Sequence, residues 1–347
     1  MRLVSIEMIK PGMRLAQPIY RYDNGNILLR ADVELKPFYI HRLKELQYSH
    51  VYIRDLNEPE ENMIIEPIKL ETRVKAGIAF RETVNVIEKT KLVNIFKLQK
   101  VVGEMVDQIT KNNDVIYNML DIRSYDNYTF AHSVNVCTIS LIIGSWMRLS
   151  RSDLEFLGIG ALLHDIGKIF VDAGILNKPS QLDPQEYEVI KKHARDGYDI
   201  LKDKICINYI SSHIAFQHHE RQDGSGYPRG LTGDKIHRFA KIVAVADVYD
   251  AMTSSRVYRQ ALPSHFVLDQ IKSDVDKKFD RAVVESLQKM IAPYPVGSLL
   301  LLTNGDTVIV HKVTRLEFKV KVDSGPREGH LYNLYHLPDV SVAKRIS

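Results

Sequence analysis

Residues 160–168 read Gly-Ala-Leu-Leu-His-Asp-Ile-Gly-Lys, an apolar helical run that ends in an adjacent histidine and aspartate. The pattern predicts that Ser152 begins this helix, with a glutamate three residues later completing a capping box, and that Gly167 ends it. Both polar heads need partners if they are buried. We therefore expect His164 and Asp165 at the C-terminal end of a buried helix, where a cation also meets the favourable end of the helix dipole.

A single His-Asp pair is more often a hydrogen-bonded core pair than a metal site, so the rest of the chain decides between the two. It supplies further candidates at His132, His193, His218, His219 and Asp247. Nitrogen and carboxylate ligands in this number, with no cysteine among them, suit a dinuclear site for iron, manganese, zinc or a similar ion. The alternative, separate satisfied core residues, would require a buried partner for each. Adjacent histidines with an aspartate able to bridge are typical of two-metal hydrolysis of phosphate esters.

The order of these motifs resembles the HD superfamily of metal-dependent phosphohydrolases. Residues 218–231 (His-His-Glu-Arg-Gln-Asp-Gly-Ser-Gly-Tyr-Pro-Arg-Gly-Leu) are similar to the signature of its HD-GYP branch. Residues 247–259 (Asp-Val-Tyr-Asp-Ala-Met-Thr-Ser-Ser-Arg-Val-Tyr-Arg) are similar to the third block of that branch. The resemblance covers residues 100–290 or so and implies an all-helical HD-type catalytic domain.

The resemblance implies two divalent metal ions, most simply iron or manganese, with Asp165 as the bridging carboxylate. It assigns two ligand sets, in which shared ligands can move: His132, His164 and Asp247 for one ion, and His193, His218 and His219 for the other. A hydroxide that bridges the metals would attack phosphorus. Lys168 would contact the phosphate as a point charge, although without the motif it would be taken for a solvated lysine after a helix end.

Four further residues, with Lys168, form the expected substrate-binding set: Tyr227, Asp250, Arg256 and Arg259. The glycine-rich loop 223–231 lets backbone approach a ligand closely and presents Tyr227, which can stack on or hydrogen-bond to a nucleotide. The arginines offer bidentate contacts to phosphate or a guanine edge. Asp250 can accept from a base or hold one arginine. The alternative, turn and surface residues, stays open for all four.

We therefore predict a cyclic di-GMP phosphodiesterase that opens the ring to linear pGpG, with continuation to GMP left open. Metal-assisted phosphodiester hydrolysis follows also from the residues themselves, whereas the substrate follows from the resemblance. One alternative is a non-catalytic module that senses cyclic di-GMP or docks partners, against which the full ligand set argues. The other is a phosphodiesterase for another cyclic dinucleotide, such as cyclic GMP-AMP.

The composition of the 347 residues, 45% hydrophobic and 26% charged, is ordinary for a globular protein of two or three domains. A net charge of +4 is small and does not itself predict binding to a nucleic-acid polymer or a membrane. We expect neither a signal peptide nor a membrane span. Two cysteines in apolar helical contexts favour a cytoplasmic location over a disulfide scaffold.

The predicted fold class is mainly α, in four parts. Residues 1–66 form a small α+β unit and linker, residues 67–125 a helical connector, residues 126–292 the catalytic domain, and residues 293–347 a β-rich extension. The apolar pattern of the connector favours helices packed on the catalytic domain, with a pair of helices that forms a homodimer as the alternative. Protein partners of the N-terminal unit are left open.

Local signals predict several element boundaries. An Asn24-Gly25 turn suggests a hairpin, followed by a helix over 37–46 and a strand over 50–53. The expected catalytic helices cover 127–148, 183 to about 197 with Asp183 as the N-cap of a capping box, 206–219, 237–254 and 263–290. Short strands are expected at 299–302, 307–310 and 318–322.

The number of metals is a separate prediction. Some HD-GYP proteins that hold three ions have a glutamate four residues before the first histidine, on the same helical face. Here that position is Tyr128, whose phenol has an ordinary pKa near 10 and is a poor ligand for a hard cation. Asp126 is six residues from His132 and off its face. We therefore expect a dinuclear centre with Tyr128 near it but not bound to an ion.

Overall fold

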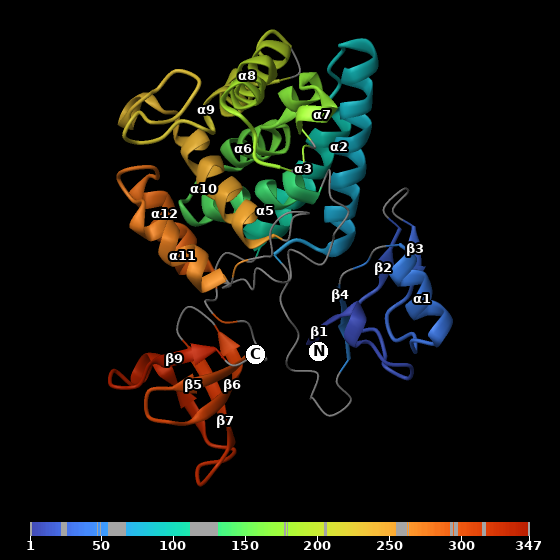
Figure 1. Ribbon diagram of the computed structural model, residues 1–347, viewed down its shortest axis with the longest axis vertical. Coiled ribbons are helices and arrows are strands. Elements are labelled where there is room, and N and C mark those ends of the chain that lie inside the picture. The colour runs from blue at the N-terminus through green and yellow to red at the C-terminus, as the bar shows by residue number, and fades with distance from the viewer. Residues whose placement is uncertain are drawn as a thin grey trace. The chain divides into compact units, whose positions relative to one another are not determined.

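The computed structural model describes residues 2–21, 26–46, 48, 50–54, 67–111, 131–176, 178, 180–204, 207–254, 262, 264–291, 294, 298–313 and 317–345. The chain divides into two compact units, one of residues 67–113 and 128–288, the other of residues 1–66, 114–127 and 289–347. The predicted class, mainly α, is confirmed: a helical part accompanies a small N-terminal α+β unit and a small C-terminal sheet (Figure 1). The division into four parts stays a prediction.

The helical part is built around one helix that is buried on nearly every side. Its helices are α2 (Leu70–Thr90), α3 (Phe96–Lys111), α5 (Ala131–Trp146), α6 (Arg151–Leu163), α7 (Ala173–Leu176), α8 (Pro184–Leu201), α9 (Tyr209–Gln217), α10 (Arg238–Thr253), α11 (Ser264–Ser273) and α12 (Arg281–Met290). α5 is the central helix, with residues 133–144 all buried, and it packs against α3, α6 and α10. α2 and α3 pack on each other, and both contact α5, so these connector helices lie on the helical core.

The start and end of α6 differ from the prediction. Ser150, not Ser152, is the N-cap, and its Oγ accepts a hydrogen bond from the backbone N–H of Asp153. The helix ends at Leu163, before Gly167, and the 3-10 helix η3 (Ile166–Phe170) follows. Both predictions were wrong because two serines lie within one turn of the helix start, and because the glycine has another role.

That role is close packing of η3 against α8. A Cβ atom added to Gly167 would lie 2.0 Å from the backbone oxygen of His193 and 2.6 Å from the backbone nitrogen of Gly197. The capping box at the start of α8 is confirmed, since the carboxylate of Asp183 accepts from the N–H of Glu186, whose carboxylate accepts from the N–H of Asp183. The predicted end near Gly197 was wrong, because α8 continues to Leu201.

The N-terminal unit pairs β1 (Arg2–Ser5) with β4 (His50–Ile53), and β2 (Ile19–Tyr20) with β3 (Ile27–Leu29), both antiparallel. The strands on either side of the expected turn therefore pair as a hairpin would, while Asn24 and Gly25 lie outside the described residues. The 3-10 helix η1 (Ile6–Met8) and α1 (Pro37–Glu45) complete the unit. Leu15, Leu35 and Leu43 are at its core.

The C-terminal sheet has five antiparallel strands in the order β8-β7-β6-β5-β9. Their bounds are β5 (Leu299–Leu302), β6 (Thr307–Val313), β7 (Phe318–Ser324), β8 (Leu331–Asn333) and β9 (Val342–Arg345). Alternating side chains on the central strands, among them Leu300, Val308 and Val320, are fully buried and form a core of its own. The last two strands were not predicted, because each is short and has little apolar pattern.

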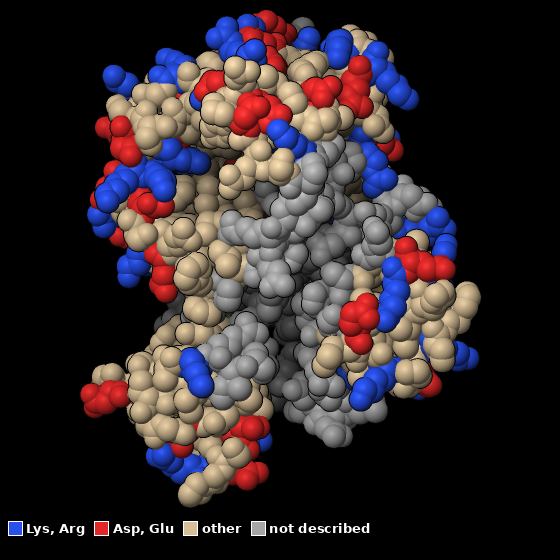
Figure 2. All heavy atoms as spheres, in the orientation of Figure 1, with Lys and Arg blue, Asp and Glu red and all other residues tan. Residues whose placement is uncertain are grey.

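The surface is mixed in charge. On the face seen in Figure 2, lysine and arginine side chains lie among aspartate and glutamate side chains. Within the described ranges, no helix combines the length and the apolar character that a membrane crossing requires.

Candidate metal centre

The predicted metal ligands come from five places in the helical part. His132 lies in α5, His164 and Asp165 follow α6, His193 lies in α8, His218 and His219 follow α9, and Asp247 lies in α10. His164, His193 and His218 are completely buried. Segments far apart in the sequence therefore meet at one point.

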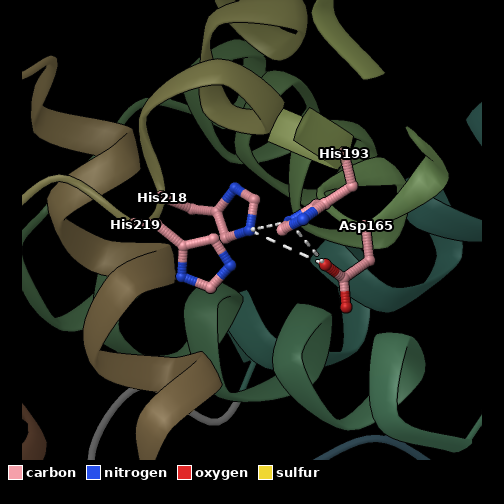
Figure 3. A group of neighbouring side chains, drawn as sticks. All are labelled: Asp165, His193, His218 and His219. Carbon is pink, nitrogen blue, oxygen red and sulfur yellow. Dashed lines mark hydrogen bonds and ion pairs between the residues drawn. The ribbon is translucent and has the colours of Figure 1, made fainter. Parts of the chain in front are cut away.

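A first group consists of Asp165, His193, His218 and His219, whose potential ligand atoms all lie within 4.8 Å of one another. Figure 3 shows the three imidazoles around one end of the carboxylate. Oδ1 of Asp165 lies 3.3 Å from Nε2 of His193 and 3.7 Å from Nε2 of His218. The two Nε2 atoms are 3.4 Å apart. Nitrogens this close, aimed at one oxygen, are arranged as ligands of one cation would be.

A second group consists of His132, His164 and Asp165. Here the other carboxylate oxygen is used, because Oδ2 of Asp165 lies 3.3 Å from Nε2 of His164 and 3.8 Å from Nε2 of His132. Asp247 joins through His132, with its Oδ1 3.2 Å from the Nε2 atom, but belongs to neither group of mutually close atoms. Each oxygen of Asp165 thus faces a different set of histidines.

Three of the histidines, His164, His193 and His218, are held so that Nε2 points at the carboxylate. Nδ1 of each lies near a carbonyl oxygen of the preceding helical turn: His164 with Ala161 at 2.8 Å, His193 with Ile190 at 2.6 Å, and His218 with Ala215 at 3.0 Å. A carbonyl accepts only, so Nδ1 must carry the proton and Nε2 keeps a free lone pair. This hydrogen bond fixes both the tautomer and the ring direction of a metal-ligating histidine.

His132 is held by a side chain instead. Its Nδ1 lies 2.7 Å from Oδ2 of Asp250, which is only 3% exposed. The other oxygen of Asp250 accepts from Asn135 at 3.0 Å and from Ser254 at 3.2 Å. The contact of Asp250 with His132 was missed by the sequence reasoning, and its expected contact with substrate stays a prediction.

Burial keeps three of the histidines neutral. It lowers the pKa of His193 to about 4, and it lowers the pKa of His218 and, further, that of His219. Imidazole binds a metal through a neutral nitrogen, so at neutral pH these three rings need lose no proton to become ligands.

The carboxylates remain charged although they are buried. Burial opposes the charge of Asp165, but Lys168 and His164 hold the pKa of its carboxyl well below the ordinary value. Burial likewise opposes the charge of Asp247, but the hydrogen bond and charge of His132, together with the neighbouring histidines, keep the pKa of its carboxyl well below the ordinary value. For His132 burial is again opposed, and the bonds to Asp247 and Asp250 raise its pKa to about 10. Asp165 and Asp247 thus stay negatively charged next to a protonated His132, and a cation can displace that proton.

Two atoms test whether the residues fit a metal. Nε2 of His164 and Oδ1 of Asp165 are buried and make no hydrogen bond to any described residue. Buried polar atoms are rarely left so. A divalent cation beside each would satisfy them, and imidazole with carboxylate suits manganese, iron or zinc. The residues fit two divalent ions.

Lys168 lies in η3, with its Nζ atom 2.5 Å from Oδ2 of Asp165. Its side chain is 35% exposed, so the ammonium reaches both the carboxylate and the solvent side of the centre. Tyr227 contacts a member of the first group, with its ring stacked on that of His219 at a centroid distance of 4.6 Å. Burial raises the pKa of the Tyr227 phenol, which therefore stays protonated and able to donate a hydrogen bond.

Glu220 holds the loop that carries Tyr227. Its buried carboxylate accepts hydrogen bonds from the backbone N–H groups of Arg229 and Leu231, each at 2.9 Å. Gly226 is required in this loop, because a Cβ there would lie 2.4 Å from the backbone oxygen of His219. The sequence shows Glu220 next to the histidines, but its partners lie 9 and 11 residues further on and give no local signal.

Four residues discussed for the site lie outside the described residues: Arg256, Arg259, Tyr128 and Asp126. The predicted arginine contacts and the predicted absence of a third metal therefore stay predictions.

Residues 114–283 match the model of the HD domain family. Three curated relatives carry similar sequences. The chain is 28% identical over 340 residues to the cyclic di-GMP phosphodiesterase PA4108 of Pseudomonas aeruginosa, covering 90% of this chain and 80% of that protein. It is 35% identical over 242 residues to a cyclic di-GMP phosphodiesterase of Thermotoga maritima, covering 66% and 65%. It is also 35% identical over 168 residues to the 3'3'-cGAMP-specific phosphodiesterase 3 of Vibrio cholerae, covering 48% and 36%.

A solved structure shares the fold. Bd1817, described as an HDG"Y"P protein from Bdellovibrio bacteriovorus, aligns with a TM-score of 0.54 at 17% identity, covering 82% of this chain and 97% of its own. The likeness at this identity concerns the arrangement of the chain rather than the reaction.

Proposed function

The chain belongs to the HD domain family as an HD-GYP phosphodiesterase, and from this premise we propose that it hydrolyses cyclic di-GMP with two bound divalent metal ions. The products we propose are linear pGpG and, if the second phosphodiester is also cut, GMP. Iron and manganese are the proposed ions.

The observation that carries the proposal is the position of Asp165 between two sets of histidines, one at each carboxylate oxygen. In the proposed assignment, Asp165 bridges the ions, His193, His218 and His219 hold one, and His132, His164 and Asp247 hold the other. Two cations in this setting would make water a nucleophile near neutral pH and would offset charge on the phosphodiester.

The other residues act on the substrate or on the ligands. Lys168 donates to a non-bridging phosphate oxygen, exchanging part of its contact with Asp165 for one with the substrate. Tyr227, stacked on His219, offers its ring and its phenol group to the nucleotide. Arg256 and Arg259 are proposed to bind phosphate or a guanine edge. Asp250 holds the ring of His132.

The test is an assay of anaerobically purified protein, loaded with Mn²⁺ or Fe²⁺, with product identification and a metal count. We expect pGpG and two ions per chain. Asp165→Asn should lower turnover more than the roughly 10–100-fold typical of residues that only support a ligand, because it removes the shared charge itself. Near-normal turnover of this variant with metal bound would refute the bridging assignment.

Two alternatives give different outcomes in the same assay. A non-catalytic sensing module would bind cyclic di-GMP and release no product at any metal loading. An enzyme for cyclic GMP-AMP, which the similarity to the Vibrio cholerae protein favours, would show a higher kcat/KM for that dinucleotide in side-by-side kinetics.

A further inference from the structure

A row of aromatic rings leads outward from the metal ligands. Tyr227 stacks on His219, and Tyr187 of α8 lies edge-on to Tyr227, with ring centroids 6.5 Å apart and an interplanar angle of 79°. Tyr187 is 47% exposed, so its ring keeps surface that nothing in the described part of the chain covers. Tyr187 is connected through Tyr227 to His219, a proposed metal ligand. Its exposed ring contributes little to the hydrophobic core.

A lysine lies over the same rings. Lys191, one helical turn after Tyr187, has its Nζ atom 5.3 Å from the ring centre of Tyr187 and 5.7 Å from that of Tyr227. Its ion pair with Glu188 joins it to a carboxylate that is 66% exposed. Pairs with such exposed partners contribute little free energy. The ammonium can therefore leave Glu188 for a ligand without a large loss.

We propose that Tyr187 and Lys191 form, beside Tyr227, a guanine-binding subsite for the substrate. The proposal rests on the function proposed above, in which a phosphate of the dinucleotide lies at the metal centre. The attached base then has to find a surface within reach, and the exposed ring of Tyr187 offers one on which a base can stack. Neither Tyr187 nor Lys191 belongs to the ligand set or to the motifs from which the site was predicted.

The lysine gives the subsite a preference for guanine. A lysine ammonium only donates hydrogen bonds. Guanine presents two acceptors, O6 and N7, on one edge, whereas adenine presents one acceptor beside an amino donor. An ammonium held beside a stacked base by cation–π contacts therefore favours guanine over adenine, and stacking by itself does not distinguish them.

A first experiment measures binding without turnover. Tyr187→Trp, in Mn²⁺-loaded protein, places a fluorophore in the subsite, and the wild-type protein with its single tryptophan, Trp146, is the reference. We expect GMP to quench the added fluorescence and AMP to do so only at concentrations at least about tenfold higher. Lys191→Met in the same background should bring GMP to the concentration that AMP requires and leave AMP unchanged.

A second experiment measures kinetics with cyclic di-GMP. Tyr187→Leu should raise KM by about fivefold to a hundredfold, as loss of one base–aromatic stack does, with kcat changed less than about twofold. Tyr187→Trp should retain the wild-type KM. The matched control is Tyr209→Leu, which removes an exposed tyrosine of α9 and should change neither constant.

The outcomes separate the two proposals. Hydrolysis with unchanged KM in Tyr187→Leu, or equal quenching by GMP and AMP, would overturn the guanine subsite and leave the proposed function standing. Absence of hydrolysis by the wild-type protein would overturn the proposed function, and the GMP and AMP titrations would still decide whether the guanine subsite exists.

Discussion

Asp250 holds a proposed metal ligand, His132, without belonging to either group of candidate ligands. Its carboxylate is the acceptor for Nδ1 of His132 and is itself held by Asn135 and Ser254. His132 is the one histidine of the two groups whose Nδ1 has a carboxylate partner among the described residues, the others with a described Nδ1 bond using backbone carbonyls. The charge of Asp250 makes His132 a better donor to a cation.

We expect Asp250→Asn to weaken metal binding by about 10–100-fold, because an amide fixes the tautomer of His132 less firmly and adds no charge. Competition with a chelating dye measures this directly. Asp234→Asn, at an exposed carboxylate of the 3-10 helix η4 (Gly233–Lys235), is the control and should leave affinity unchanged. Equal metal affinity in the Asp250 variant and wild type would show that His132 does not depend on Asp250.

Substitution of Lys168 should lower the rate of hydrolysis without lowering the metal content of the protein. Lys168→Ala removes the ammonium proposed to meet the phosphate and leaves every predicted ligand in place. We expect turnover to fall by about tenfold or more, the equivalent of one charge-assisted hydrogen bond, while metal per chain stays constant. Lys235→Ala, at an exposed lysine of the 3-10 helix η4 (Gly233–Lys235), is the control. If metal content falls in step with the rate, Lys168 supports Asp165 rather than the substrate.

The metal-ligand candidates could be predicted from the sequence because histidine and aspartate in ordered motifs are few and chemically specific. The residues that hold them could not. Asp250 lies 118 residues from His132 in the chain. The carboxylate of Glu220 accepts from backbone N–H groups, which carry no sequence signal. The contact between His132 and Asp250 depends on how α5 and α10 pack against each other, and no local sequence pattern predicts that packing.

At the scale of elements, the predictions succeeded where one local signal stood alone. The capping box at Asp183 fixes the start of α8. They failed where a glycine was taken for a stop signal. Gly167 and Gly197 lie where η3 meets α8, so each glycine permits a close approach between two elements rather than ending one. A sequence pattern does not distinguish these two uses of glycine.

Gly167→Ala should therefore damage both stability and the site. The added Cβ would lie 2.0 Å from the backbone oxygen of His193, and a flexible side chain cannot relieve such a clash because the neighbour is backbone. We expect a loss of about 1–3 kcal/mol in the free energy of unfolding. Metal affinity should fall as well, because η3 carries Lys168 and α8 carries His193, and both side chains contact Asp165.

The control is Gly103→Ala in α3, where the nearest atom to an added Cβ is the end of a flexible arginine side chain at 4.0 Å. This change should stabilise the protein by about 0.5–1 kcal/mol, since alanine favours the helix interior. Urea unfolding measures both variants. Equal behaviour of the two would mean that η3 can move away from α8 without loss.

At the scale of the molecule, the chain has separate hydrophobic cores. The N-terminal unit and the C-terminal sheet each bury their own apolar cluster. Both metal groups found among the described residues use side chains of the helical part alone. Loss of metal should therefore act on one part of the chain, and calorimetry can separate that part from the others.

Chelation of the loaded protein should lower the melting temperature of the helical part. Without cations, the buried charges of Asp165 and Asp247 are offset by Lys168 and the surrounding histidines, chiefly His164 and His132. An ion at 100 times its dissociation constant stabilises the folded state by about 2.7 kcal/mol, which corresponds to roughly 5–10 °C for a unit of this size. The transitions of the terminal parts should not move.

Asp165→Asn should lose most of the metal-dependent shift, because its ligand set is incomplete. Identical melting of wild-type protein with and without chelator, after metal analysis has confirmed its removal, would mean that the ions do not couple to the folding of this unit.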